Sequence, residues 1–158
     1  MGLETGRVGQ AFVAADLQYV GDPPFTRNPA FRGPVVHGTT LRWPGGDRYG
    51  DAARILFSYP AGESGSNFAQ RHDLRVYVSS DDATSFSPGV RVFGGKASYS
   101  DMVVLDEGRV GILFENARDG EDYNARVDFR PLVLQQLDDP TVLAWSFEDG
   151  AVGSPVKS

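Results

Sequence analysis

The sequence predicts an all-β fold, and three observations support this prediction. Gly occurs 19 times and Pro 10 times among 158 residues. Both residues interrupt helices and mark turns, and these counts are high for a helical protein. No window of eleven or more residues keeps the 3.6-residue apolar period of an amphipathic helix. Short apolar runs are instead separated by turn residues every ~8–12 residues, a spacing typical of a sandwich, a barrel or a propeller.

The first third of the chain contains two predicted strands and a long loop. Residues 7–14 alternate loosely between apolar and polar side chains and predict a strand, whose partner strand we expect to lie outside this sequence. Residues 21–34 hold four prolines and two glycines and predict a loop. Residues 35–43 predict the next strand, which ends at the turn beginning with Pro44.

The middle of the chain predicts a series of short strands. Residues 54–59 are almost continuously apolar, as in a strand buried on both faces, whereas residues 74–79 alternate with period two. The remaining expected strands are 90–93, 102–105, 110–115 and 123–134. Residues 141–148 alternate again and predict either a last strand or the start of another module. We expect the last ten residues to be unstructured.

Composition excludes several classes of partner. The net charge is −6. Nucleic acids and anionic membranes are negatively charged and bind proteins with positively charged surfaces, so neither is expected as a general partner. The sequence has no apolar run near the ~20 residues of a membrane span, and its first residues do not show the basic-then-apolar pattern of a signal peptide. It has no cysteine, so disulfides and thiolate metal sites are excluded and the compartment stays open. At this length we expect one compact unit.

The segment Ser79–Phe86 follows a predicted strand and has the chemistry of a turn. The Asp81 carboxylate can accept hydrogen bonds from turn N–H groups, while Phe86 fills the space beneath the sheet. The segment resembles the Asp box, Ser-x-Asp-x-Gly-x-Thr-Trp, with Ala83, Ser85 and Phe86 departing from the pattern. This resemblance favours a propeller among the three β architectures. We group residues 36–43, 52–59, 73–79 and 89–93 as one four-stranded blade, with 7–14 in the blade before it and 101–131 in the blade after it.

Four residues resemble functional positions of the sialidases (neuraminidases). Ser98-Tyr99-Ser100-Asp101 is similar to the segment that carries the tyrosine nucleophile of that family. Gln70-Arg71-His72-Asp73-Leu74 is similar to the segment of the third triad arginine, and Arg7-Val8 to that of the second. Glu115 matches a glutamate that orients the first triad arginine. The spacings, 64 residues from Arg7 to Arg71 and 28 from Arg71 to Tyr99, suit positions in neighbouring blades. We therefore expect Arg7, Arg71 and Tyr99 to converge on one face, with Tyr99 at the mouth of a strand. We expect Glu115 to lie nearby, partly buried and lacking a polar partner.

The resemblance implies a retaining exo-α-sialidase that releases terminal sialic acid. Sialic acid carries a carboxylate on its anomeric carbon, which would repel an aspartate or glutamate nucleophile, and a neutral phenol avoids this repulsion. Because a tyrosine pKa is about 10, a neighbouring carboxylate must take the proton. Arginines bind the substrate carboxylate through paired hydrogen bonds. The resemblance further implies a sialylated glycan or sialic acid as ligand, no cofactor, and a secreted or cell-surface bacterial parent protein.

The resemblance covers only the C-terminal part of such a catalytic domain. We assign residues 1–137 to two or three blades of a six-bladed propeller and residues 138–158 to a last strand or linker and a tail. The first triad arginine, the acid/base aspartate and the glutamate that pairs with the nucleophile would lie in a missing N-terminal part. The chain by itself is therefore expected to be inactive. The alternative is a non-catalytic Asp-box module that binds glycan or another protein.

Metal binding is not predicted. His37 and His72 have no second ligand at a metal-site spacing and are interpreted as ordinary strand or loop residues. Residues 119–122 are interpreted as a solvated acidic turn, with a calcium site as the open alternative.

Overall fold

Most of the described chain is β-strand. The structure is a computed structural model that describes residues 7–13, 19–45, 53–63, 65, 67–105, 108–122 and 124–138, with side chains described for most residues from Phe31 onward. It contains eight strands, one five-residue α-helix (α1, Leu134–Asp138) and one 3₁₀ turn (η1, Phe68–Gln70). The predicted all-β class is confirmed. None of the helices in the described ranges is long and apolar enough to cross a membrane.

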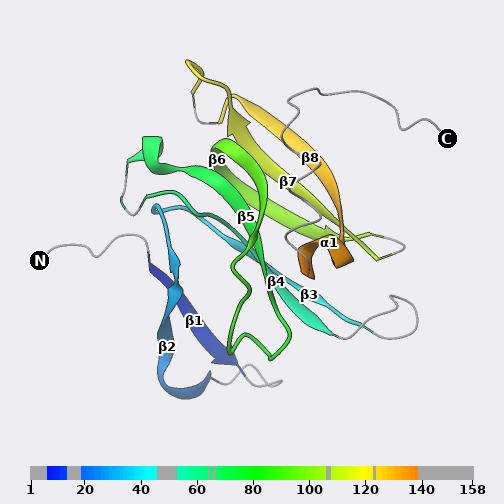
Figure 1. Ribbon diagram of the computed structural model, residues 1–158. Coiled ribbons are helices and arrows are strands. Elements are labelled where there is room, and N and C mark those ends of the chain that lie inside the picture. Colours follow the sequence, from blue (N-terminus) through cyan, green and yellow to red (C-terminus); the bar gives the residue numbers. More distant parts are fainter. Residues whose placement is uncertain are drawn as a thin grey trace, which may run out of the picture.

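The strands form two antiparallel sheets. In Figure 1, a hairpin lies at one end of the molecule and a larger sheet extends away from it. The hairpin consists of β1 (Arg7–Val13) and β2 (Tyr19–Arg32). In the larger sheet each strand pairs with the next one along the chain. Its members are β3 (Thr39–Trp43), β4 (Arg54–Pro60), β5 (His72–Ser79), β6 (Val90–Val104), β7 (Arg109–Ala117) and β8 (Arg126–Val133).

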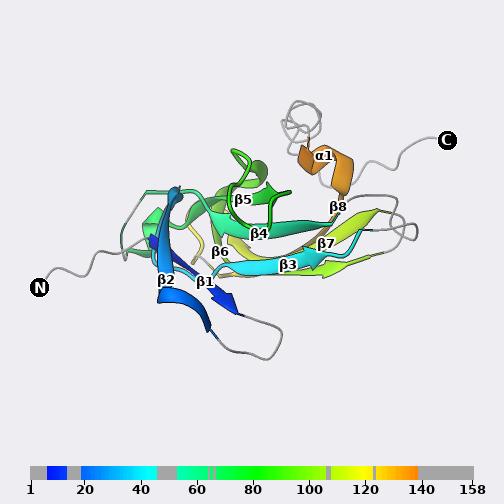
Figure 2. The ribbon, with the colours of Figure 1, turned by 90° about the horizontal axis from the view of Figure 1, so that it is seen from below.

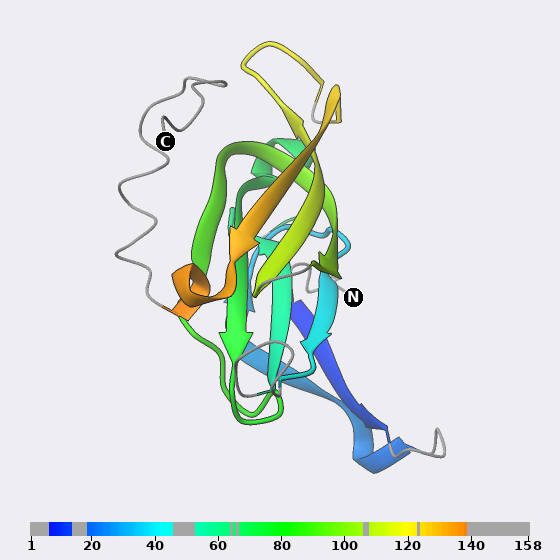
Figure 3. The same cartoon turned by 90° about the vertical axis from the view of Figure 1, so that its right-hand side faces the viewer.

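The six-stranded sheet curls into a half-barrel. Figures 2 and 3 show its strands wrapping around a common interior instead of lying in one plane. The curl brings the middle of β6 against strands that are not its neighbours in the sheet. The hydroxyl of Ser100 on β6 lies 2.8 Å from that of Ser58 on β4, and Thr39 of β3 donates to Asp101 Oδ1 at 3.4 Å. Side chains from β3, β4 and β6 are therefore within reach of one another.

Two apolar clusters occupy opposite faces of β4 and β5. Leu56 and Val76 belong to the large core, which α1 closes with Leu134 and Leu137. Phe57 and Tyr77 face the other way and pack with Phe31, Tyr59 and Phe86. Because both faces of β4 are covered, its residues from Leu56 to Pro60 are all buried. The predicted two-sided burial of this strand is confirmed.

Two predictions about this hairpin are wrong. Residues 21–34 are not a loop, because β2 extends from Tyr19 to Arg32. The partner of the first strand does not lie outside this sequence, because β1 pairs with β2. Proline has no N–H group to donate to a sheet, so Pro23, Pro24 and Pro29 argued against a strand. In the described chain β2 pairs only with β1, however, and the pairing is interrupted by two register shifts. A strand with one unpaired edge and an irregular ladder can accommodate prolines.

The predicted separation of residues 90–93 from 102–105 is also wrong. Both belong to β6, which runs without a break from Val90 to Val104. Lys96 pairs with His72 of β5 on one side and with Ala117 of β7 on the other. The four strands grouped as one blade are indeed neighbours, but no sheet boundary separates them from β7 and β8. Gly94 and Gly95 lie inside the strand.

Smaller differences concern the C-terminal strand. Residues 123–134 were expected to be one strand, whereas β8 covers Arg126–Val133 and Leu134 begins α1. The predicted strand 141–148 and the predicted tail lie outside the described residues.

Candidate functional site around Tyr99

A bulge in β6 determines the position of Tyr99. Ala97 pairs with Asn116 and Ser100 pairs with Phe114, so two residues, Ser98 and Tyr99, lie opposite Glu115 alone. A bulge of this kind re-aims a side chain without ending the strand. The Tyr99 side chain is 48% exposed, whereas Ser98 and Ser100 on either side are buried. Tyr99 was expected at the mouth of a strand, and the structure instead has it in the middle of a long one.

The two serines beside Tyr99 hold the bulge to the layer beneath it. Ser98 Oγ accepts a hydrogen bond from the Arg71 guanidinium at 3.0 Å. Ser100 Oγ shares a hydrogen bond with Ser58 Oγ. Buried hydroxyl groups without such partners would destabilise the fold, so these contacts also secure the backbone on both sides of Tyr99.

A capped 3₁₀ turn positions Arg71. Asn67 Oδ1 accepts the N–H of Ala69 at 3.0 Å, and Gln70 Oε1 accepts the N–H of Asn67 at 3.1 Å. This reciprocal pair is a capping box, which fixes the start of η1. Arg71 follows directly as the residue that ends η1, so its backbone direction is set by the turn.

The Arg71 guanidinium lies among aromatic rings and is largely buried. Its central carbon is 4.5 Å from the centre of the Phe68 ring and 5.6 Å from that of the Tyr99 ring, within cation–π range. Arg71 is only 7% exposed, and its second terminal nitrogen donates to the carbonyl of Val35 at 2.7 Å. The sequence prediction that Arg71 and Tyr99 come together therefore agrees with these distances. An incoming carboxylate would have to compete with the Ser98 and Val35 contacts.

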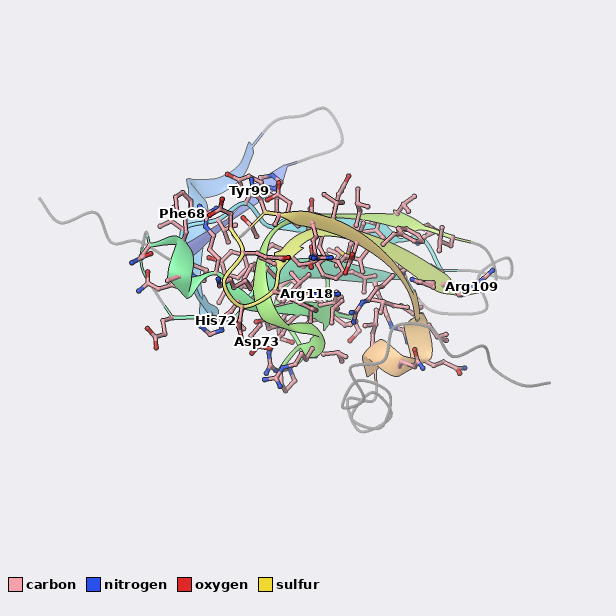
Figure 4. All side chains as sticks on the ribbon, turned by 90° about the horizontal axis from the view of Figure 1, so that it is seen from above. Phe68, His72, Asp73, Tyr99, Arg109 and Arg118 are labelled. Atoms are coloured by element: carbon pink, nitrogen blue, oxygen red, sulfur yellow. The ribbon has the colours of Figure 1, made fainter. Side chains whose placement is uncertain are left out.

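Sequence reasoning missed three neighbours of this pair. The His37 ring meets the Tyr99 ring edge-on at 6.4 Å between centres. Phe68 and Val35 are both close to half exposed although they are apolar. Figure 4 shows Phe68 and Tyr99 close together at one end of the molecule, with Arg109 at the opposite end. These partly exposed aromatic side chains around the buried Arg71 guanidinium were not predictable from the sequence. They come from η1, from the segment before β3 and from β6, which are far apart along the chain.

Glu115 lies opposite the bulge on β7. Its side chain is half-buried, and Oε2 is 3.5 Å from the backbone nitrogen of Tyr99, a long hydrogen bond. The sequence predicted that Glu115 lies near Tyr99, partly buried and lacking a polar partner. Its location and burial agree, whereas the Tyr99 N–H is a polar partner that was not anticipated.

Arg7, the other predicted carboxylate ligand, can be described only through its backbone. It begins β1 and pairs with Arg32 of β2. Its side chain lies outside the described residues, so the predicted convergence of Arg7 with Arg71 and Tyr99 stays a prediction.

The remaining charged clusters have structural partners. Asp73 accepts from Arg91 at 2.6 Å and from Arg75 at 3.0 Å. Burial alone would raise the Asp73 pKa, but these hydrogen bonds and charges lower it overall. In the acidic turn, hydrogen bonds from the Arg126 side chain and the Arg118 N–H hold the Glu121 pKa at about 2. Within the described residues, no group of three or more His, Asp or Glu side chains is arranged to hold a metal ion.

Comparison of the sequence with known proteins found no match. No protein-family model matches the chain. No curated protein matches it either. The resemblance to sialidases therefore rests on the segments around Arg7, Arg71, Tyr99 and Glu115 and on the Asp-box turn at residues 79–86.

Proposed function

We propose that this chain forms the C-terminal part of an exo-α-sialidase, a retaining glycosidase that releases terminal sialic acid through a tyrosine nucleophile. The observation that carries the proposal is the pairing of an exposed phenol, Tyr99, with a guanidinium 5.6 Å from the centre of its ring. A glycosidase that attacks an anomeric carbon bearing a carboxylate needs these two groups side by side. Tyr99 would form the covalent bond to that carbon, and Arg71 would bind the carboxylate.

The proposal assigns supporting roles to two further residues. Arg7 would supply a second guanidinium to the substrate carboxylate, and Glu115 would orient the first triad arginine. The sequence contains no segment that matches that first arginine, the acid/base aspartate or the glutamate that pairs with the nucleophile. Release of the sugar would accordingly require residues supplied from elsewhere in the catalytic domain.

The finer architecture that we propose is a portion of a sialidase-type propeller. Its support is the turn between β5 and β6, where Asp81 Oδ1 accepts the Ser85 N–H at 2.9 Å. Phe86, at the end of the same turn, packs edge-on against Phe31 and Phe57. An acidic turn locked by its own carboxylate and anchored by an aromatic residue is the arrangement that an Asp box requires. In this proposal β6 is shared by two consecutive blades.

Binding of free sialic acid tests this function without requiring turnover. Saturation-transfer NMR with N-acetylneuraminic acid is expected to give signals that are lost with its carboxyl methyl ester, which has no negative charge for Arg71 to bind. Arg71→Lys should weaken binding about tenfold, since lysine cannot form the paired contact. Arg109→Lys, at the other end of the molecule, is the matched control and should bind normally. Equal signals from acid and ester, or no signal from either, would refute the proposal.

A second function is favoured by the burial of Arg71. Its hydrogen bonds to Ser98 and Val35 are those of a structural arginine, and the aromatic groups around it remain exposed. A non-catalytic module could use Tyr99, Phe68 and His37 as a platform on which a neutral sugar ring of a glycan, or an apolar segment of another protein, would stack. Binding of an asialo-glycan that matches binding of its sialylated form, with loss on Phe68→Ala, would favour this alternative.

A further inference from the structure

The outer surface of the sheet carries an exposed apolar patch that reaches the candidate site. We call it the outer patch. Five side chains belong to it, and they are between 38% and 61% exposed: Val103, Leu113, Val127, Phe129 and Val133. Leu113 pairs with Phe129 across β7 and β8, and Val127 pairs with Glu115, the residue opposite the Tyr99 bulge. Exposed apolar side chains gathered on one face of a sheet indicate a surface that a partner covers.

The outer patch ends at an edge of the sheet. β8 is the last strand of the six, it pairs with β7 alone in the described chain, and it lies along the outside of the sheet in Figure 1. Pro131 pairs with Gly111 although proline has no N–H group, and a strand accommodates proline where its nitrogen faces the open edge. Because main-chain direction alternates along an antiparallel strand, Val127 and Phe129 also direct their N–H and C=O groups to this edge.

We propose that a second copy of this chain covers the region, with its β8 pairing antiparallel to β8 of the first copy about a two-fold axis at Phe129. Two-fold dimers are the commonest oligomers, and their interfaces must be complementary to themselves. At this axis the N–H and C=O groups of Phe129 in the two copies bond to one another. The Val127 N–H of each copy reaches the Pro131 carbonyl of the other, so proline weakens the pairing without preventing it.

The charges of β8 select this register. Asp128 of each copy lies opposite Arg130 of the other, and opposite charges at directly paired positions stabilise a sheet. An axis at Asp128 would place the two Asp128 carboxylates opposite each other, and an axis at Arg130 would do the same with two guanidinium groups. An axis between two residues would bring the outer face of one copy beside the core face of the other. A symmetric partner therefore satisfies both charges of the strand at once.

Arg130 can bind the second copy and keep its place in the fold. Its Nη1 donates to the Val92 carbonyl at 2.7 Å, and its guanidinium carbon lies 5.6 Å from the centres of the Phe93 and Phe114 rings. A guanidinium carries several N–H donors, so it can bind this carbonyl and a carboxylate together. Asp128 and Arg130 are both half-buried, and salt screens such a pair less than an exposed one. The pairing does not depend on which ligand Tyr99 serves.

Sedimentation velocity of the full chain over about a hundredfold range of concentration tests the pairing. We expect a dimer that dissociates on dilution. Asp128→Arg places a second arginine opposite Arg130 on both sides of the axis and should raise the dissociation constant about tenfold. Glu63→Arg makes the same change in net charge at an exposed residue between β4 and β5, and as the matched control it should leave the dimer unchanged.

Mixing two charge variants tests the register. Arg130→Glu places a glutamate opposite Asp128 and should also weaken the dimer of that variant with itself. In a mixture of the Asp128→Arg and Arg130→Glu chains, every arginine at these positions meets an acidic residue of the other variant. A heterodimer is therefore expected that is tighter than either homodimer.

Phe129→Cys gives a readout that does not depend on Arg130. The chain has no cysteine of its own, and at the axis the two Cα atoms of residue 129 lie about 5.5 Å apart, which suits a disulfide. Mild oxidation should give a cross-linked dimer on a non-reducing gel. Val133→Cys, exposed on the same strand, lies about 27 Å from its counterpart and should stay reduced.

A chain that sediments as a monomer throughout the concentration range would overturn the proposal, and so would a dimer that Asp128→Arg leaves intact. Two folded charge variants that form no tighter heterodimer would exclude the register, as would equal cross-linking of Phe129→Cys and Val133→Cys. If Arg130→Glu does not fold, the comparison of the two cysteine variants decides the register.

Discussion

The Arg71 guanidinium carbon lies 5.6 Å from the centre of the Tyr99 ring, although 28 residues separate the two in the sequence. Arg71 ends η1, before β5, and Tyr99 lies in the bulge of β6. The backbone N–H of Ala97 also donates to the Arg71 carbonyl at 3.0 Å, so the two segments are joined by main-chain as well as side-chain contacts. Arg71 and Tyr99 thus form one unit of structure, whichever ligand they serve.

The chain as given is expected to show no turnover of a fluorogenic sialoside. The proposed nucleophile is present, but no segment matches the acid/base aspartate or the glutamate that pairs with the nucleophile. The measurement is fluorophore release compared with a blank. Release that disappears in Tyr99→Phe would show that this chain does supply those groups, and release that persists in Tyr99→Phe would indicate contamination.

Ala83→Gly is expected to stabilise the turn between β5 and β6. Ala83 has φ of 65°, a left-handed conformation that costs a residue with a Cβ roughly 1–2 kcal/mol and glycine almost nothing. Part of this gain is lost because glycine has more freedom in the unfolded chain, so we expect a net gain of about 0.5–1 kcal/mol in the free energy of unfolding. Urea denaturation measures it. Ala69→Gly in η1 is the control and should destabilise.

Acidification should destabilise the protein through Asp73. Its pKa is lowered in the folded state, so its carboxylate stabilises the fold fully above the unfolded pKa, near 3.9, and this contribution is lost as the pH falls through the lower folded value. Asp73→Asn should therefore reduce stability at pH 7 and flatten its pH dependence below about pH 4. Thermal unfolding between pH 2 and pH 7 is the measurement.

Asp82→Asn is the matched control for this change. Asp82 also has positive φ and also pairs with an arginine, Arg42, but at 3.5 Å and with both side chains largely exposed. Exposed ion pairs contribute little to stability, so its pH profile should match that of the unmodified chain. An equal effect of the two substitutions would contradict the role given to Asp73.

Gly62→Ala is expected to disturb the candidate site from a distance. A Cβ at Gly62 would approach the backbone oxygen of Gln70 to 2.0 Å, which is not tolerable, and Gln70 directly precedes Arg71. The backbone of η1 would have to shift, at a cost of about 1–3 kcal/mol in stability. Urea denaturation and the NMR signals of the Tyr99 ring should report the two effects together. Gly94→Ala, whose Cβ would meet only Arg91 Cδ at 3.6 Å, is the control.

Local sequence patterns predicted the strands whose burial is regular. The continuous apolar run of β4 follows directly from the covering of both its faces. The alternation of β5 predicted the strand but not its burial, because Val76 to Ser79 are buried on both faces. The Asp81 turn was also predictable, because its hydrogen bonds join residues within a few positions of one another. The predictions of a loop over residues 21–34 and of a break between residues 93 and 102 failed, because strand pairing in the folded chain outweighed the local preference of proline and glycine for turns. β2 contains prolines that only an irregular edge strand can hold, and β6 continues through Gly94 and Gly95.

The sequence by itself determined the all-β class, the chemistry of the turn and the identity of Arg71 and Tyr99 as candidates, since these depend on residue type and short-range spacing. Only the tertiary structure decided that β6 bulges opposite Glu115, that Arg71 is buried against Ser98 and Val35, and that His37 and Phe68 border Tyr99. The physical reason is that a bulge and a curled sheet arise from pairing between distant strands. Which side chains meet at such a place depends on register and curvature, and no pattern within a single strand records either of them.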